Sequence, residues 1–195
     1  MNRGKGLGVL GLIAAVFCTS ADASIIEGSV TFSEPSEWSA DVSYAVYAPG
    51  TYPGDRADKD TMYVYTYQVF NDASSTPTLS SFSVGLLDGA GAASPDDDPT
   101  YGVAGGVAPL LSRLVGSPPT SVQWTIDVDA DEHTTLLLFS SPHSYTFKAA
   151  TLANGGEGDT HLMPTPLPEP VSLSLLALGA VALVRRRRQR PGLAH

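Results

Sequence analysis

The stretch MYVYTYQVF, residues 62–70, decides the fold class of this chain. Tyr63, Tyr65 and Tyr67 alternate with other side chains, so they would project from one face of an extended strand. Aromatic and β-branched residues favour strands, and an Asn-Asp pair directly after the run favours a turn. Aromatic side chains repeated at every second position lie more often in a core than on a binding surface. The stretch therefore predicts a strand with its aromatic face buried.

Similar alternation recurs on both sides of this strand, whereas no segment before residue 171 keeps a 3.6-residue period. Only the short run 110–115 suggests a helix. Short strands separated by Pro, Gly, Ser and Asp are typical of an antiparallel β-sandwich, and we expect an all-β domain over residues 24–152. Besides 62–70, the expected strands are 25–32, 42–46, 82–86, 122–126, 136–139 and 145–151.

Two segments of the chain are rich in Gly and Pro. Residues 88–120 are too long for a hairpin connection and predict a surface excursion or mobile loop. Residues 153–167 predict a spacer after the domain. On this reading the folded part ends near residue 152.

Residues 1–23 have the three parts of a secretory signal peptide. Two basic residues are followed by the apolar run 7–17, which is too short to span a bilayer comfortably. Ala21 and Ala23 then supply the small-x-small cleavage pattern and make Ser24 the expected mature start. Cys18, the one cysteine of the chain, lies inside this segment, so the mature protein would contain no disulfide and no thiolate metal site. We expect an N-terminal signal-peptide helix that is removed on export.

The C-terminal end also has three parts in a fixed order. Pro168, Glu169 and Pro170 precede the uncharged run VSLSLLALGAVALV, residues 171–184. As a helix this run would cover about 21 Å, less than the hydrocarbon core of a bilayer. Four arginines follow and would stay on the cytoplasmic side, which leaves the domain outside. These are Arg185, Arg186, Arg187 and Arg188.

This tail, residues 168–190, resembles the PEP-CTERM sorting signal of Gram-negative bacteria. In that family the Pro-Glu-Pro motif, the short hydrophobic helix and the arginines are read by exosortase, a membrane transpeptidase. The resemblance implies cutting near the motif, with the tail residues acting as substrate. It also implies export through the inner membrane to the envelope, cell surface or extracellular matrix, with extracellular polysaccharide as a partner. The alternative interpretation is a simple tail anchor with a stop-transfer cluster.

The charge distribution separates the two ends from the middle of the chain. Residues 24–170 carry nineteen acidic residues and four basic ones, a net charge of −15, although the whole chain has −9. A nucleic-acid-binding domain would need a basic face to neutralise phosphates. The sequence therefore excludes nucleic acid as a partner of the middle domain.

Acidic residues also give the one candidate for a cofactor. Asp127, Asp129 and Asp131 have a D-x-D-x-D spacing that can bring oxygens to Ca²⁺. An EF-hand loop would need Gly at its sixth position and an acid at its twelfth, where this chain has Glu132 and Leu138. A looser calcium site, completed by Glu132 or by residues 96–98, remains an alternative to a solvent-exposed strand end. We favour the exposed strand end and expect no cofactor.

Catalytic motifs are absent from the sequence. The histidines form no H-E-x-x-H pattern, and no nucleophile elbow or Walker motif occurs. We therefore expect a non-enzymatic surface or matrix protein. Two alternatives remain: a carbohydrate- or calcium-binding adhesion module, with Trp38, Tyr47 or Tyr52 stacking on sugar, and a secreted glycan-active enzyme.

Overall fold

The computed structural model describes residues 24–35 and 37–168. The signal-peptide residues Ala21 and Ala23, the sorting residues from Glu169 onward and both expected terminal helices lie outside the described residues. No helix in the described part of the chain is long and apolar enough to cross a membrane.

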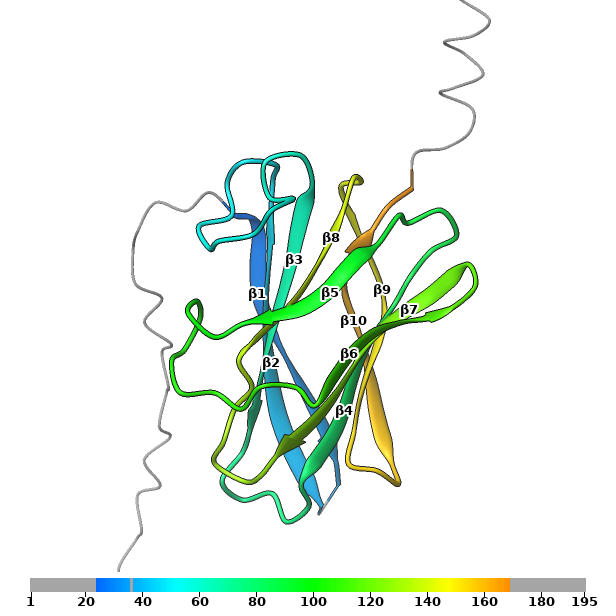
Figure 1. Cartoon of the computed structure of the whole chain (residues 1–195). Coiled ribbons are helices and arrows are strands. Elements are labelled where there is room, and N and C mark those ends of the chain that lie inside the picture. The colour runs from blue at the N-terminus through cyan, green and yellow to red at the C-terminus, as the bar shows by residue number, and fades with distance from the viewer. Residues whose placement is uncertain (1–23, 36, 169–195) are drawn as a thin grey trace, which may run out of the picture.

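The described residues form ten β-strands in two antiparallel five-stranded sheets, as the sequence pattern predicts for a β-sandwich (Figure 1). The first sheet has the order β1-β2-β3-β8-β5 and the second has the order β10-β9-β4-β7-β6. The strands are β1 (Ser24–Glu34), β2 (Trp38–Tyr47), β3 (Tyr63–Asn71), β4 (Leu79–Gly85), β5 (Ala93–Asp98), β6 (Leu111–Gly116), β7 (Pro119–Val128), β8 (Leu136–Ser141), β9 (Tyr145–Ala153) and β10 (Gly158–Pro166).

Strand β3 confirms the prediction made for residues 62–70. Tyr65 and Tyr67 lie fully inside the main core between the sheets, and Tyr63 packs against its edge. Tyr65 stacks on Phe139 of β8 with ring centroids 4.9 Å apart. Trp124 of β7 closes the same cluster from the opposite sheet, 6.0 Å from the Tyr67 ring. Aromatic packing between the sheets therefore holds the sandwich together.

The opposite face of β3 is also buried, which alternation alone does not predict. Val64, Thr66 and Gln68 point away from the main core, yet almost none of their surface reaches solvent. Val64 joins a second, smaller core with Tyr52 from the β2–β3 connection and two leucines of β8. The connections 48–62 and 99–107 thus cover the outer face of the first sheet. Tyr52 in the smaller core holds the first connection there, and the hydrogen bond from the Gln68 side chain to the Val103 carbonyl holds the second.

Two expectations about the Gly- and Pro-rich segments are wrong. Residues 88–120 contain β5 and β6, and the run 110–115, expected as a helix, lies mostly in β6. Residues 153–167, expected as a spacer, contain β10, which pairs with β9 from Gly158 to Pro166. Prolines are compatible with β10 because it is an edge strand and needs fewer ladder donors.

Strand β10 belongs to the folded domain by its packing as well as its pairing. Met163 and Thr165 are fully buried, and the Tyr67 hydroxyl donates a hydrogen bond to the Pro164 carbonyl at 2.5 Å. The domain therefore continues beyond residue 152 and ends at Pro166.

Candidate functional site

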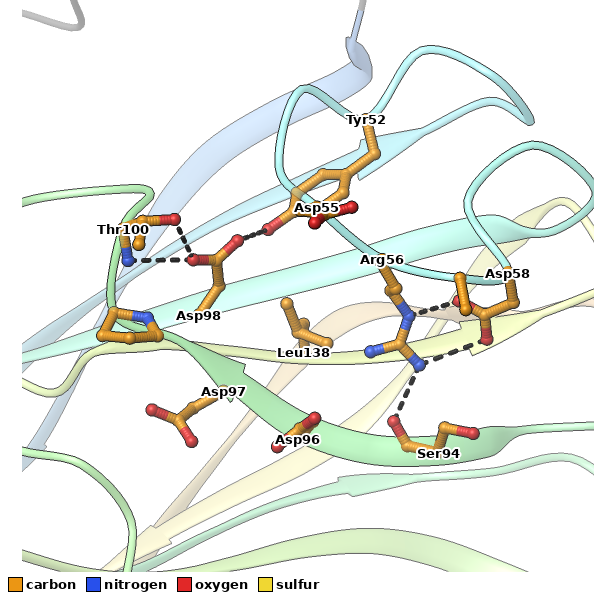
Figure 2. Close-up of a pocket in the computed structure, with 12 residues that line it drawn as sticks. Tyr52, Asp55, Arg56, Asp58, Ser94, Asp96, Asp97, Asp98, Thr100 and Leu138 are labelled. Atoms are coloured by element: carbon orange, nitrogen blue, oxygen red, sulfur yellow. Dashed lines mark hydrogen bonds and ion pairs between the residues drawn. The ribbon is translucent and has the colours of Figure 1, made fainter.

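A pocket of about 610 Å³ lies where the β2–β3 connection meets β5 and β8. Figure 2 shows acidic side chains converging on it from both sides. Leu138 of β8 supplies an apolar part of the lining. The polar lining includes five aspartates and one arginine: Asp55, Arg56 and Asp58 from the connection, and Asp96, Asp97 and Asp98 from β5.

Asp98 is held by hydrogen bonds at one end of the pocket. The Tyr52 hydroxyl donates to its Oδ2 at 2.7 Å, and the Thr100 amide and hydroxyl donate to its Oδ1 at 2.9 and 2.6 Å. Burial acts to raise the pKa of Asp98, but the hydrogen bonds from Thr100 and Tyr52 outweigh it, so the pKa lies below its usual value. Burial and the bond to Asp98 raise the pKa of Tyr52. The phenol thus stays the donor and the carboxylate the acceptor.

Gly54 lets Tyr52 and Asp98 approach each other. A Cβ at position 54 would lie 2.6 Å from the Tyr52 ring and would also collide with the Asp98 carboxylate. The backbone of the β2–β3 connection therefore passes this hydrogen bond at a distance that only glycine permits.

Arg56 and Asp58 form the opposite wall as an ion pair. Arg56 Nε lies 2.5 Å from Asp58 Oδ1, and Arg56 Nη2 also donates to the Ser94 carbonyl at 2.8 Å. The hydroxyl of Ser140, in β8, donates a hydrogen bond to the Asp58 carboxylate. Burial acts to raise the pKa of Asp58, but the Arg56 and Ser140 hydrogen bonds and the Arg56 charge bring it below its usual value. This network joins the β2–β3 connection to β5 and β8.

Among the described residues, the Asp55 and Asp96 carboxylates have no hydrogen-bond or ion-pair partner (Figure 2). Asp97 accepts one hydrogen bond, from the Thr135 hydroxyl at 2.8 Å. These oxygens remain available to a ligand, whereas those of Asp58 and Asp98 stabilise the fold. The pocket can therefore attract a cation or accept hydrogen bonds from hydroxyl groups.

The other aspartates proposed from the sequence lie elsewhere. Asp127 is near the end of β7 and is exposed, as are Asp129 and Asp131 in the following turn. Asp129 accepts a hydrogen bond from the Thr78 hydroxyl at 2.5 Å. Within 24–35 and 37–168, no group of three or more His, Cys, Asp or Glu is arranged to hold a metal ion. The exposed strand end expected for these residues is confirmed.

The aromatic residues suggested for sugar stacking are mostly internal. Trp38 and Tyr52 are each 3% exposed, Trp38 in the main core and Tyr52 in the smaller one, so the expectation of an exposed stacking surface there is wrong. Tyr47 packs partly buried against Tyr52, with ring centroids 5.3 Å apart. Trp38 and Tyr52 are therefore structural residues.

Sequence reasoning missed the pocket, although it contained a signal for it. Residues 96–98 are expected only to complete a calcium site, and the acidic residues within 55–60 form no motif, so the sequence predicts no contact between the two runs. Their pairing across β5 and β8 depends on the strand order, which no local pattern reveals.

Of the two predicted cleavage regions, the structure describes Ser24 and Pro168. Ser24 is the first residue of β1, and Pro168 follows the end of β10 by two residues. No protein-family model, curated protein or solved structure matches the chain.

Proposed function

We propose that this chain is an exported, non-enzymatic protein of the cell surface or extracellular matrix, sorted by a C-terminal PEP-CTERM signal. The observation that carries the proposal is the position of the folded domain. All ten described strands lie between Ser24, which follows the Ala-Asp-Ala pattern in the sequence, and Pro166, two residues before the first proline of the Pro-Glu-Pro motif. Both proposed cleavages therefore leave the sandwich intact.

The sequences of the two ends of the chain determine the partners that we propose. The secretion machinery would recognise residues 1–23, and exosortase would recognise Pro168, Glu169 and Pro170 together with the arginines at 185–188. The run 171–184 would enter the inner membrane at least transiently. The product would reach the cell exterior as an acidic domain in contact with matrix polysaccharide.

Two of the five aspartates that line the pocket have structural partners, which supports a structural role for them. Asp58 and Asp98 are committed to Arg56, Ser140, Tyr52 and Thr100, and those bonds connect structural elements. The lowered pKa values keep both groups ionised near neutral pH, so neither is a proton donor there.

Substitution of the sorting motif tests the proposal. In cells that contain exosortase, we expect the exported wild-type chain to lose its arginine tail and the Glu169→Ala, Pro170→Ala double variant to retain it. Glu157→Ala, which removes an exposed acid at the β9–β10 turn, is the control and should be processed normally. Equal loss of the tail from both variants would contradict recognition of the motif.

A second proposal is a binding module for Ca²⁺ or a carbohydrate, and it is favoured by the open carboxylates of Asp55 and Asp96. Calorimetry on the mature protein should show heat on adding Ca²⁺ or neutral oligosaccharides, and Asp55→Asn with Asp96→Asn should remove it. Asp127→Asn with Asp129→Asn is the matched control. The absence of heat with both ligands would contradict the proposed binding role.

A further inference from the structure

Three large apolar side chains are exposed at the C-terminal side of the second sheet. Phe147 of β9 is 43% exposed, Leu162 of β10 is 64% exposed, and Leu167 just after β10 is 47% exposed. We call these three residues the β9–β10 strip. Isolated exposed apolar residues are normal on a protein, so the argument depends on where these three lie.

Two members of the strip lie on the outer face of the β9–β10 hairpin. Ala150 and Leu152 of β9 point into the main core, so Phe147 and Ala149, at alternate positions, point outward. Leu162 is directly opposite Ala149 in the register, which places it on the same outer face beside Phe147. Tyr145 continues the apolar surface, with its ring centroid 6.0 Å from that of Phe147.

The outward-facing residues paired with Phe147 and Leu162 across the hairpin are Pro164 and Ala149, so neither partner is acidic. The cross-strand neighbours towards the β9–β10 turn are Thr151 and Thr160, whose hydroxyls lie 3.0 Å apart. Asp159, on the same hairpin, turns towards β1, where it accepts a hydrogen bond from the Ser33 amide and pairs with His161. The hairpin part of the strip thus carries no carboxylate. The nearest charged residues are Lys148, which follows Phe147 in β9 and donates to the Leu86 carbonyl, and the exposed Asp88, which is next to Gly89 at the Leu167 end.

The strip leads to the point where the chain leaves the domain. The Leu167 amide donates a hydrogen bond to the Ser144 carbonyl at 2.7 Å, and Pro168 lies against Gly89. In Figure 1 the end of β10 and the turn between β8 and β9 lie at the same end of the sandwich. These contacts fix the exit point within the fold as far as Pro168.

Only Glu169 and Pro170 separate this fixed point from the uncharged run that starts at Val171. Three residues of extended chain reach about 10 Å. While the run 171–184 is in a membrane, the exit end of the sandwich must therefore lie at the bilayer surface, and the short tether makes its contact with lipid effectively intramolecular.

We propose that the β9–β10 strip docks on the interfacial region of the bilayer while the tail is inserted. This inference rests on the proposed membrane stage of sorting and adds the orientation of the domain. Transfer of the Phe and Leu side chains from water to this interface is favourable, and the hairpin part of the strip carries no carboxylate that anionic lipids would repel. The docked domain would hold the end of β10, and with it the Pro-Glu-Pro motif, at the membrane surface, within reach of a membrane enzyme.

Site-specific labelling tests the orientation. The full chain is made in cells lacking exosortase, with Cys18→Ser and with Leu162→Cys as the single attachment point for the environment-sensitive dye NBD. The control carries the dye at Leu111→Cys, which is 48% exposed on β6, at the opposite edge of the same sheet. Both proteins are mixed with phosphatidylcholine–phosphatidylglycerol vesicles, and flotation is measured beside the emission spectrum.

We expect both proteins to float with the vesicles, and only the dye at position 162 to shift to the blue and to be quenched by brominated lipid. Adding Phe147→Ser and Leu167→Ser should reduce that shift without preventing flotation. Flotation with identical, water-like emission at positions 162 and 111 would overturn the docking proposal and leave the sorting proposal standing. Failure to float would overturn the membrane stage itself.

Discussion

The hydroxyl of Tyr52 donates a hydrogen bond of 2.7 Å to the carboxylate of Asp98. It connects the β2–β3 connection to the edge strand β5, and the two residues are 46 positions apart in the sequence. The bond closes one end of the acidic pocket and anchors the ring that completes the smaller core. The pocket and the covered outer face of the first sheet thus depend on the same contact.

Removing this hydroxyl should destabilise the protein. Tyr52→Phe keeps the ring but takes one donor from the buried Asp98, and a hydrogen bond to a charged group contributes about 1.5–3 kcal/mol. We expect the free energy of unfolding, measured in urea, to fall by that amount. The control is Tyr63→Phe, because the Tyr63 hydroxyl has no hydrogen-bond partner among the described residues. An equal loss in both variants would contradict a specific role for the bond.

Stability should decrease in acid. The pKa values of Asp58, Asp98 and Asp159 are lower in the folded protein than in the unfolded chain, so the folded state favours the ionised forms. Their contribution is fully present above the unfolded value of about 4 and is lost as the pH falls through the folded values. Urea midpoints between pH 7 and pH 2.5 should show this decline.

The Asp98→Asn variant separates the contribution of this one carboxylate to acid sensitivity. It should be less stable than the wild type at pH 7, and its urea midpoint should fall less steeply below pH 4. Asp127→Asn, at an exposed position, should follow the wild-type curve. A steeper fall for Asp98→Asn would mean that the sign of the Asp98 shift is wrong.

Two phenylalanines provide a matched test of the core. Phe139 is fully buried and stacks on Tyr65, whereas Phe147 is 43% exposed. Phe139→Ala should cost about 3–5 kcal/mol because it leaves a cavity between the sheets. Phe147→Ala should cost less than about 1 kcal/mol. Thermal or urea unfolding measures both, and comparable losses would contradict the assigned positions.

Truncation tests where the domain ends. A chain of residues 24–168 should fold and unfold cooperatively, because it contains all ten described strands. A chain of residues 24–156 lacks β10, removes Met163 from the core and exposes the edge of β9, so it should aggregate or fail to fold. A folded 24–156 chain would restore the spacer interpretation of residues 153–167.

The fold class could be predicted from residues such as Tyr65 and Tyr67 because alternation is a local property that survives in the buried strand. The assignment of β6 and β10 could not. Leu111 and Leu114 resemble the start of a helix, and the prolines of β10 resemble a linker, until pairing with β7 and β9 decides their conformation. Tertiary context overrode local propensity at both edges of the second sheet.

The pocket was harder to predict than the fold for the same reason. Arg56, in the β2–β3 connection, meets Ser140 because β3 pairs with β8 and places Ser140 opposite Val64. The sequence does not show whether Trp38 and Tyr52 are exposed, and only the packing of the two cores shows that both are internal. The motifs at the two ends are local sequence patterns, and the sorting role that we propose for them requires no folded context.

The intact mass of the exported protein, compared between cells with and without exosortase, tests the account most directly. We predict that cells with the enzyme yield a product that begins at Ser24 and ends before Arg185, so that the whole sandwich is kept and the arginine cluster is lost. Cells without it should yield a product that still contains the tail. A chain that extends through Arg188 in both strains would contradict the proposed sorting.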